Sequence, residues 1–200
     1  MPKNTLVNQI ISLGKRLYQL RLVAGTSGNL SAKFNNYIFI TATGSSLGDL
    51  RKKDIIKVNL KNKKINKRVS SEFPLHRLIY EKLPVKRIIH CHPPLTNAYF
   101  SLYNSLKPLT KETKFYLKEI PVIKQKTVTV SNPQEVVMAL KHNRLVVLKN
   151  HGVVAIGDDF KDALYLIEIL EEAVKIWSVA KLFKKKIPDI LKEKLKDILK

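Results

Sequence analysis

The sequence lacks the features that mark secreted, membrane-spanning and disordered proteins. Its 200 residues include one cysteine, so no disulfide can form within the chain. No apolar run approaches the roughly 18 residues that a transmembrane helix needs, and the first residues lack the apolar stretch of a secretory signal. Apolar residues make up 44% and charged residues 26% of the chain, which is typical of a globular domain. We therefore expect a soluble protein of a reducing, cytoplasmic compartment.

Acidic residues are scarce. The chain has 37 lysines and arginines against 16 aspartates and glutamates, which gives a formal net charge of +21. Such a field attracts anions, and both nucleic acids and phosphorylated small molecules are candidates. Dispersed lysines are most often a solvated surface, so the charge alone selects neither. Because the sequence shows no recognised nucleic-acid motif and no aromatic platform, a basic nucleic-acid-binding protein is the less favoured alternative.

Internal repeats and linkers rich in glycine and serine are also missing. We therefore expect one domain over residues 1–186, followed by a basic helical tail over residues 187–200. Pro188 separates the two. The apolar residues of the tail recur at helical spacing, so we expect the tail to pack on a neighbouring subunit or over the mouth of the active site.

The hydrophobic pattern predicts helices and short strands in alternation. Helices are expected over residues 4–20, 70–83, 95–103, from 133 onwards and over 159–185. Their N-caps are expected at Asn4 or Thr5, Ser71 and Asn132. Strands are expected at 30–34, 37–41, 55–60, 86–92, 145–148 and 153–156, and an extended segment at 115–130. Because many strands are short and joined by hairpins, the predicted class is α/β with a largely antiparallel sheet.

Two histidines lie one residue apart on an expected strand. Side chains at positions i and i+2 of a strand share a face, so His90 and His92 can reach one metal ion while Cys91 points away. His151 lies in a turn between two apolar strands, where it could supply a third imidazole. Three histidines leave a coordination position open for substrate, as catalytic zinc sites do. Structural histidines are also common, and the pattern alone leaves both interpretations open.

Three short polar segments are rich in backbone and hydroxyl donors. They are Gly25-Thr26-Ser27-Gly28-Asn29, Thr41-Ala42-Thr43-Gly44-Ser45, and Ser70-Ser71-Glu72 at an expected helix start. Each alone is most often an ordinary turn, and Glu72 is equally explained as an acid favoured in a first helical turn. Together the three segments offer donors for an anion. None matches a Walker loop or a dinucleotide fingerprint, so nucleotide binding is not supported.

Five segments in this order resemble the class II aldolase/adducin family: GTSGNLS, ITATGSSLGDL, SSEFPLH, IIHCHPP, and LKNHGVVAIG before a long helix. Their order and spacing agree over residues 5–180. The resemblance implies a three-layer α/β fold, with a central, mostly antiparallel sheet flanked by helices. It also implies a homotetramer with active sites at subunit interfaces, and one Zn²⁺ per chain held by Glu72, His90, His92 and His151.

The resemblance further implies the roles of the polar segments. Glu72 is expected to act as the acid/base that moves the proton at the substrate's hydroxymethyl carbon. The substrate phosphate is expected to be held by Gly28, Asn29, Thr43, Gly44, Ser70 and Ser71. The expected substrate is L-fuculose 1-phosphate or a similar ketose 1-phosphate, which is cleaved to dihydroxyacetone phosphate and an aldehyde.

Other members of the family perform different reactions at similar sites. The pentulose-phosphate 4-epimerases typically carry Asp at the position of Glu72, which argues against epimerisation. The methylthioribulose-1-phosphate dehydratases usually have a longer insertion after the paired histidines, and here the segment from His92 to Pro121 is compact. An aldolase is therefore favoured, with the epimerase and the dehydratase as alternatives.

The remaining candidates receive simpler interpretations. A tyrosine acid found in some relatives is missing from residues 108–113, and Tyr116 is the nearest tyrosine. His76 and His142 match no ligand position. His76 is expected to pack or hydrogen-bond within its helix, and Cys91 is expected to be a small buried residue.

Overall fold

The computed structural model describes residues 3–62 and 66–183. The expected tail over residues 187–200, and the last residues of the helix expected over 159–185, lie outside the described residues. No helix among the described residues is both long and apolar enough to cross a membrane.

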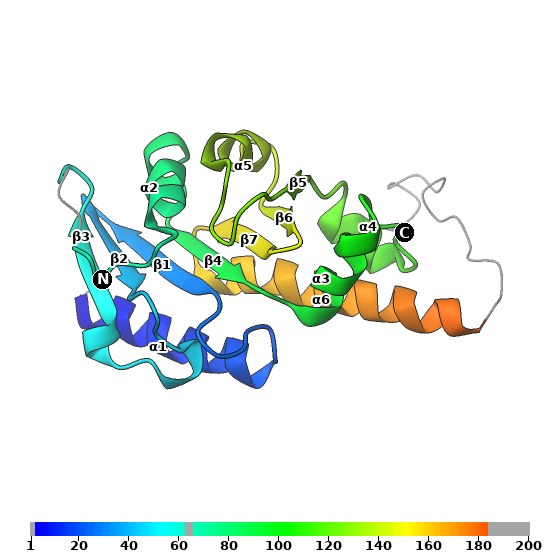
Figure 1. Ribbon diagram of the computed structural model, residues 1–200, viewed down its shortest axis with the longest axis horizontal. Helices are drawn as coiled ribbons and strands as arrows, with labels where there is room; N and C mark the ends of the chain where they lie inside the picture. Colours follow the sequence, from blue (N-terminus) through cyan, green and yellow to red (C-terminus); the bar gives the residue numbers. More distant parts are fainter. Residues whose placement is uncertain (1–2, 63–65, 184–200) are drawn as a thin grey trace.

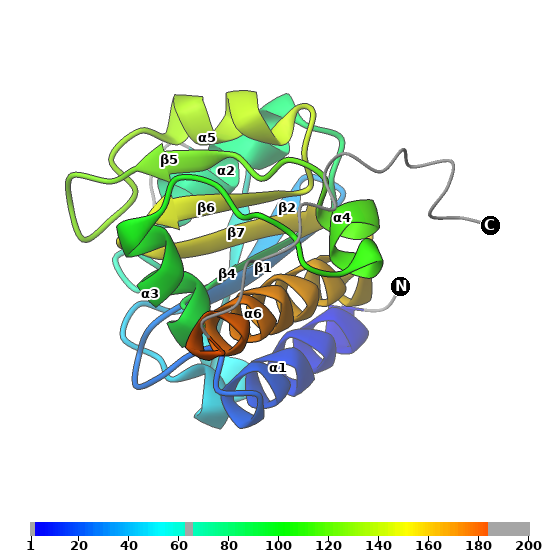
Figure 2. The same ribbon diagram turned by 90° about the vertical axis from the view of Figure 1, so that its right-hand side faces the viewer.

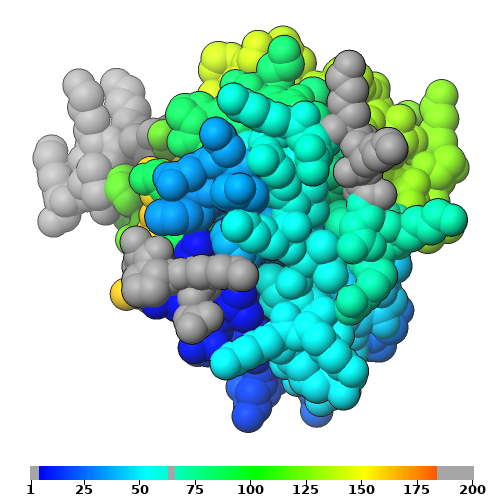
Figure 3. Space-filling view, turned by 90° about the vertical axis from the view of Figure 1, so that its left-hand side faces the viewer, coloured from blue at the N-terminus to red at the C-terminus, as the bar shows by residue number. Residues whose placement is uncertain are grey.

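Seven strands form one sheet in the order β3-β2-β1-β4-β7-β6-β5 (Figure 1). Every neighbouring pair is antiparallel except β5 and β6, which are parallel, so the predicted antiparallel character is confirmed. In the view onto the β3 edge, the cyan residues of β3 and the segments around it cover the centre of that face (Figure 3). The strands are β1 (Asn29–Phe34), β2 (Tyr37–Thr41), β3 (Ile55–Asn59), β4 (Arg87–Cys91), β5 (Val122–Lys124), β6 (Leu145–Lys149) and β7 (Gly152–Gly157).

Helices cover both faces of the sheet, which gives the expected three layers (Figure 2). α1 (Lys3–Gln19) and α6 (Phe160–Leu182) bury one apolar core against one face, and α2 (Phe73–Lys82) and α5 (Pro133–Leu140) bury a second core against the other. α3 (Pro94–Leu102) and α4 (Lys111–Leu117) pack beside α6. Two short 3-10 turns, at Leu47–Asp49 and Lys52–Asp54, connect β2 to β3.

Several expected boundaries differ from the structure. The first helix begins at Lys3, so neither Asn4 nor Thr5 caps it. The N-cap of α2 is Glu72 and not Ser71. Residues 115–130 are not uniformly extended, because the first of them lie in α4, which Thr110 caps by accepting a hydrogen bond from the Thr113 N–H. The expected cap at Asn132 is confirmed, since its side chain accepts from the Glu135 N–H.

The register of the strands gathers the polar segments at one end of the sheet. Asn29 at the start of β1 lies opposite His90 near the end of β4, and Cys91 lies opposite Val153 near the start of β7. The chain also leaves β2, β5 and β6 at this end, because β2 is antiparallel to β1, β6 is antiparallel to β7, and β5 is parallel to β6. We call this the histidine end of the sheet.

Candidate functional site

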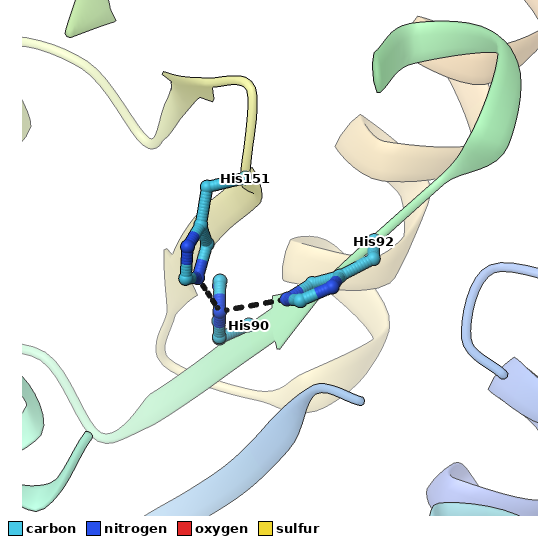
Figure 4. A group of neighbouring side chains, drawn as sticks. All are labelled: His90, His92 and His151. Atoms are coloured by element: carbon cyan, nitrogen blue, oxygen red, sulfur yellow. Dashed lines mark hydrogen bonds between the residues drawn. The ribbon is translucent and has the colours of Figure 1, made fainter. Parts of the chain in front are cut away.

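Three imidazoles converge at the histidine end (Figure 4). His90 near the end of β4, His92 just after β4 and His151 in the β6–β7 turn place their ring nitrogens within 4.8 Å of one another. The Nε2 of His90 lies 2.9 Å from the Nε2 of His151 and 3.1 Å from the Nε2 of His92. The predicted grouping of the three histidines is therefore present in the structure.

Backbone contacts set the orientation of these rings. His90 Nδ1 lies 2.9 Å from the Val153 carbonyl oxygen. Because a carbonyl only accepts, Nδ1 carries the proton and the Nε2 lone pair faces the other two rings. The amide nitrogen of Asn97, on α3, donates to the His151 carbonyl oxygen at 3.2 Å. The contact of His90 Nδ1 with a carbonyl oxygen is typical of a metal-binding histidine, whose second ring nitrogen usually donates to such an acceptor.

Glycine is required beside the cluster. A Cβ at Gly152 would contact the Cys91 carbonyl oxygen and would lie 2.7 Å from the His92 ring. The turn before it contains Asn150 with φ at 63°, a left-handed conformation that asparagine tolerates. The Asn-His-Gly order thus lets the β6–β7 turn carry His151 close to the end of β4.

Burial keeps all three imidazoles neutral. Burial lowers the pKa of His90 well below its ordinary value, and His92 and His151 nearby lower it further. Burial and the neighbouring His151 lower the pKa of His92 to about 4, and burial also lowers the pKa of His151. Neutral imidazoles that present lone pairs to one point are what a transition metal such as zinc binds.

Glu72 lies outside the cluster of ligand atoms in the described part of the chain. It is buried at the N-cap of α2, and its two carboxylate oxygens accept from the Val130 N–H at 3.0 and 3.3 Å. Burial raises the pKa of Glu72, although the Val130 hydrogen bond opposes this. The carboxylate is therefore held by the segment that follows β5, a contact that the sequence did not predict.

The three expected anion loops meet at the same end of the sheet. Gly28, with φ at 78°, precedes Asn29, which is buried and lies opposite His90. The Thr43 N–H donates to the Arg68 carbonyl oxygen at 2.9 Å, and a bridge between Ala42 and Val69 joins the second loop to the third. Among the expected phosphate residues, Ser70 is buried, and Thr43, Gly44 and Ser71 are exposed.

A cavity of about 470 Å³ opens beside the second loop. Thr43, Gly44 and Ser45 line it together with three cations, Arg51, Lys67 and Arg68, and two acids, Asp49 and Asp54, of which Asp54 pairs with Arg51. Nothing in the sequence distinguishes these three cations, because lysines and arginines are spread over the whole chain. Only the fold brings Arg51, Lys67 and Arg68 beside the second loop.

The other candidates lie away from the cluster or are packed in the core. Cys91 is buried, as expected, and burial raises the pKa of its thiol. His76 is fully buried as expected, but its hydrogen bond goes to Ser31 of β1 and not to a residue of its own helix. Tyr116 and His142 line a cavity together with Arg144. Arg144 lies just before the start of β6, whereas His151 lies just after its end. Tyr116 therefore lies toward the opposite end of the sheet from the histidine cluster of the same chain.

Comparison with known proteins agrees with this geometry. The sequence model described as Class II Aldolase and Adducin N-terminal domain matches residues 8–178. An L-fuculose phosphate aldolase of Methanocaldococcus jannaschii is 34% identical over 179 residues, covering 88% of this chain and 98% of that protein. A crystal structure of L-fuculose-1-phosphate aldolase from Thermus thermophilus superposes with a TM-score of 0.84 at 28% identity, covering 93% of this chain and 99% of the other. A methylthioribulose-1-phosphate dehydratase of Microcystis aeruginosa is 31% identical over 132 residues, covering 62% of this chain and 61% of that protein.

Proposed function

The chain belongs to the class II aldolase and adducin family, and from that premise we propose that it is a zinc-dependent aldolase that cleaves L-fuculose 1-phosphate or a similar ketose 1-phosphate. The products are dihydroxyacetone phosphate and an aldehyde. The observation that carries this proposal is the convergence of three neutral imidazoles beside three anion-donor loops, in a chain whose relatives include L-fuculose phosphate aldolases.

The donor set fits a divalent metal ion. We propose that His90, His92 and His151, together with Glu72, would hold one Zn²⁺ per chain. A bound zinc ion acts as a Lewis acid that stabilises negative charge on the substrate's oxygens. The low pKa values of the three histidines support this assignment, since no proton has to leave before the metal binds.

Glu72 is proposed to move the proton. Cleavage breaks the bond between C3 and C4 of the ketose, the C4 hydroxyl gives its proton to a base at the aldehyde end as the aldehyde forms, and the electron pair stays on the dihydroxyacetone phosphate fragment. Glu72 then donates a proton to the carbon that becomes the hydroxymethyl group. Its raised pKa favours the protonated form, which suits a group that must hold the proton before it releases it.

The phosphate is proposed to bind remotely from the reacting carbons. Residues proposed to hold it are Gly28, Asn29, Thr43, Gly44, Ser70 and Ser71. The bridge that joins the second loop to the third supports this, and so do Lys67 and Arg68, which line the cavity beside the second loop. Binding energy from the phosphate orients the sugar toward the histidines.

A homotetramer with active sites at subunit interfaces, located in the cytoplasm, is part of the proposal. The C-terminal ends of α3 and α6 expose Leu102 (76%), Leu182 (77%) and Phe183 (71%). Large apolar side chains exposed together are typical of protein interfaces. Because Tyr116 lies toward the far end of the sheet from the cluster of its own chain, the group that takes the C4 hydroxyl proton at the aldehyde end has to come from another residue or from a neighbouring chain.

The test is a panel of ketose phosphates, assayed with and without a chelator. We expect dihydroxyacetone phosphate to be released from L-fuculose 1-phosphate or a close analogue, to stop with chelator, and to return with zinc. Dehydration of methylthioribulose 1-phosphate, with no dihydroxyacetone phosphate from any ketose phosphate, would contradict the aldolase. That outcome would favour a methylthioribulose-1-phosphate dehydratase, the activity for which one relative of this chain is named.

A further inference from the structure

A polar network joins α2 to β1 inside an otherwise apolar core. The Ser31 hydroxyl lies 2.6 Å from His76 Nδ1 and 2.8 Å from the Tyr80 hydroxyl. Ser31 and His76 are fully buried and Tyr80 is 2% exposed. The surrounding side chains of α2, β2 and β4, such as Phe73, are apolar. The proposed mechanism assigns no role to these three residues.

The network continues a line of polar residues that leads to the site. Glu72, His76 and Tyr80 are spaced four apart, so they follow one face of α2, and the His76 N–H donates to the Glu72 carbonyl oxygen at 3.2 Å. Asn29 and Ser31 share a face of β1. Four helical residues and two strand residues each span about 6–7 Å, so the two rows run in step.

The direction of the two rows follows from the contacts at their far end. Lys33 Nζ donates to the Tyr80 carbonyl oxygen at 2.9 Å, so the C-terminal part of α2 lies at the Lys33 end of β1. The N-terminal end of α2, with Glu72, therefore lies toward Asn29. Since Asn29 lies opposite His90 in the sheet, the register of α2 on β1 decides where Glu72 stands relative to the histidines.

Stability alone does not account for the network. Among the described residues, His76 Nε2 is a buried atom without a hydrogen-bond partner, and burial lowers the pKa of this histidine to about 3, so the ring is neutral. Buried polar groups with unmet hydrogen bonds cost free energy, and apolar residues of similar shape are often as stable or more so. Directional hydrogen bonds instead favour a single register, whereas apolar packing tolerates small shifts.

We propose that Ser31, His76 and Tyr80 are positioning residues that fix the register of α2 on β1 and so hold the Glu72 carboxylate at the level of His90. The Val130 N–H holds the same carboxylate from the segment after β5. This inference rests on the proposed role of Glu72, but the position of Glu72 is also measurable without any substrate.

The first test replaces the network by apolar residues in the variant Ser31→Ala/His76→Leu/Tyr80→Phe. We expect a melting temperature equal to or above that of the wild type, kcat lower by about 10–100-fold, and KM changed by about twofold at most. We also expect hydrogen exchange at the Val130 amide to be at least about tenfold faster, with the amides of β4 unchanged. The control Thr113→Val removes a buried hydroxyl at α4 and should leave kcat and the Val130 amide as in the wild type.

A second pair of variants covers the case in which the triple variant does not fold. His76→Asn places a polar atom near Nδ1 and keeps the contact with Ser31, whereas His76→Gln places one near Nε2 and loses that contact. We expect His76→Asn to retain more activity and slower exchange at Val130 than His76→Gln.

The outcomes separate this inference from the proposed function. A folded triple variant with wild-type Val130 exchange, or equal behaviour of the Asn and Gln variants, would overturn the positioning role. If the wild type cleaves no ketose phosphate but the Val130 amide responds as expected, the proposed function is wrong while the positioning of Glu72 stands.

Discussion

At the scale of single residues, the histidine cluster depends on three side chains that contribute one nitrogen each. Removing one leaves two imidazoles beside Glu72, one ligand short of the four that the proposed site supplies, so binding of a divalent ion is weakened. We expect His92→Ala to lose most of its bound metal, as measured by elemental analysis of the purified protein. The matched control is His142→Ala, which removes an exposed histidine that precedes β6 and should leave metal content unchanged. Full metal content in His92→Ala would remove His92 from the proposed site.

Glu72 is the residue whose charge, rather than shape, matters for the proposed reaction. Glu72→Gln keeps an oxygen that can accept from the Val130 N–H but loses the ability to carry the proton. We expect kcat to fall by about 10²–10⁴-fold with little change in melting temperature. Steady-state kinetics beside thermal unfolding tests this, and an active Glu72→Gln enzyme would exclude Glu72 as the acid/base.

His76 should make the protein sensitive to acid. In the unfolded chain His76 takes up a proton near pH 6.5, but burial lowers its pKa in the folded protein to about 3. Its contribution to stability is therefore complete above pH 6.5 and is lost as the pH falls toward the folded pKa. One such buried histidine lowers the free energy of unfolding by up to about 1.4 kcal/mol per pH unit, which amounts to about 1.6 kcal/mol between pH 6.5 and 5.

The variant His76→Leu isolates this effect. We expect the free energy of unfolding, from urea titrations at several pH values, to fall less steeply for His76→Leu than for the wild type between pH 6.5 and 5. All other titrating groups are common to the two proteins. Parallel curves would show that His76 is protonated in the folded protein over this range.

At the scale of elements, the start of α3 is held by α6. The Glu171 carboxylate accepts from the Leu95 N–H at 3.0 Å, the Thr96 N–H at 2.8 Å and the Thr96 hydroxyl at 2.7 Å. This carboxylate satisfies free N–H groups at a helix N-terminus, where negative charge is favoured. The same helical turn follows His92 and, through Asn97, holds the carbonyl of His151.

We therefore expect Glu171→Ala to loosen both histidines. Losing a charged acceptor for three donors should lower the free energy of unfolding by about 1–3 kcal/mol, and metal affinity should drop by about 10–100-fold, as for other residues that orient metal ligands. Glu172→Ala is the matched control. Glu172 is exposed, and within the described residues it forms an ion pair only with Lys175 of the same helix. Chelator competition measures the affinity, and equal affinities in both variants would contradict the role of Glu171.

At the scale of the whole molecule, the net charge of +21 should act on the approach of an anionic substrate. Long-range attraction is screened by salt within about 10 Å at 0.1 M, whereas the chemical step inside the site is affected far less. We expect kcat/KM for the phosphorylated substrate to fall as NaCl rises from about 20 to about 500 mM while kcat stays nearly constant. A salt-independent kcat/KM would show that the dispersed lysines only solvate the surface.

The sequence alone determined those features that depend on neighbours along the chain. Alternation and turn residues located six strands, and the spacing of His90 and His92 placed both at the end of one strand. Asn132 before Pro133 marked a helix start. The helix at Lys111–Leu117 was not predicted, and part of it was expected to be extended, because it is short and adjoins the extended β5 segment.

Only the tertiary structure decided which distant residues meet. Val130 lies 58 residues from Glu72, and Ser31 lies 45 residues from His76, yet each pair is within hydrogen-bond distance. Local patterns encode which face of an element is buried and where it ends, but not which element lies beside it. Those contacts are settled by the order of the strands, the parallel pairing of β5 with β6 and the place of α2 over β1. These three features arise together, when helices cover both faces of the sheet at once.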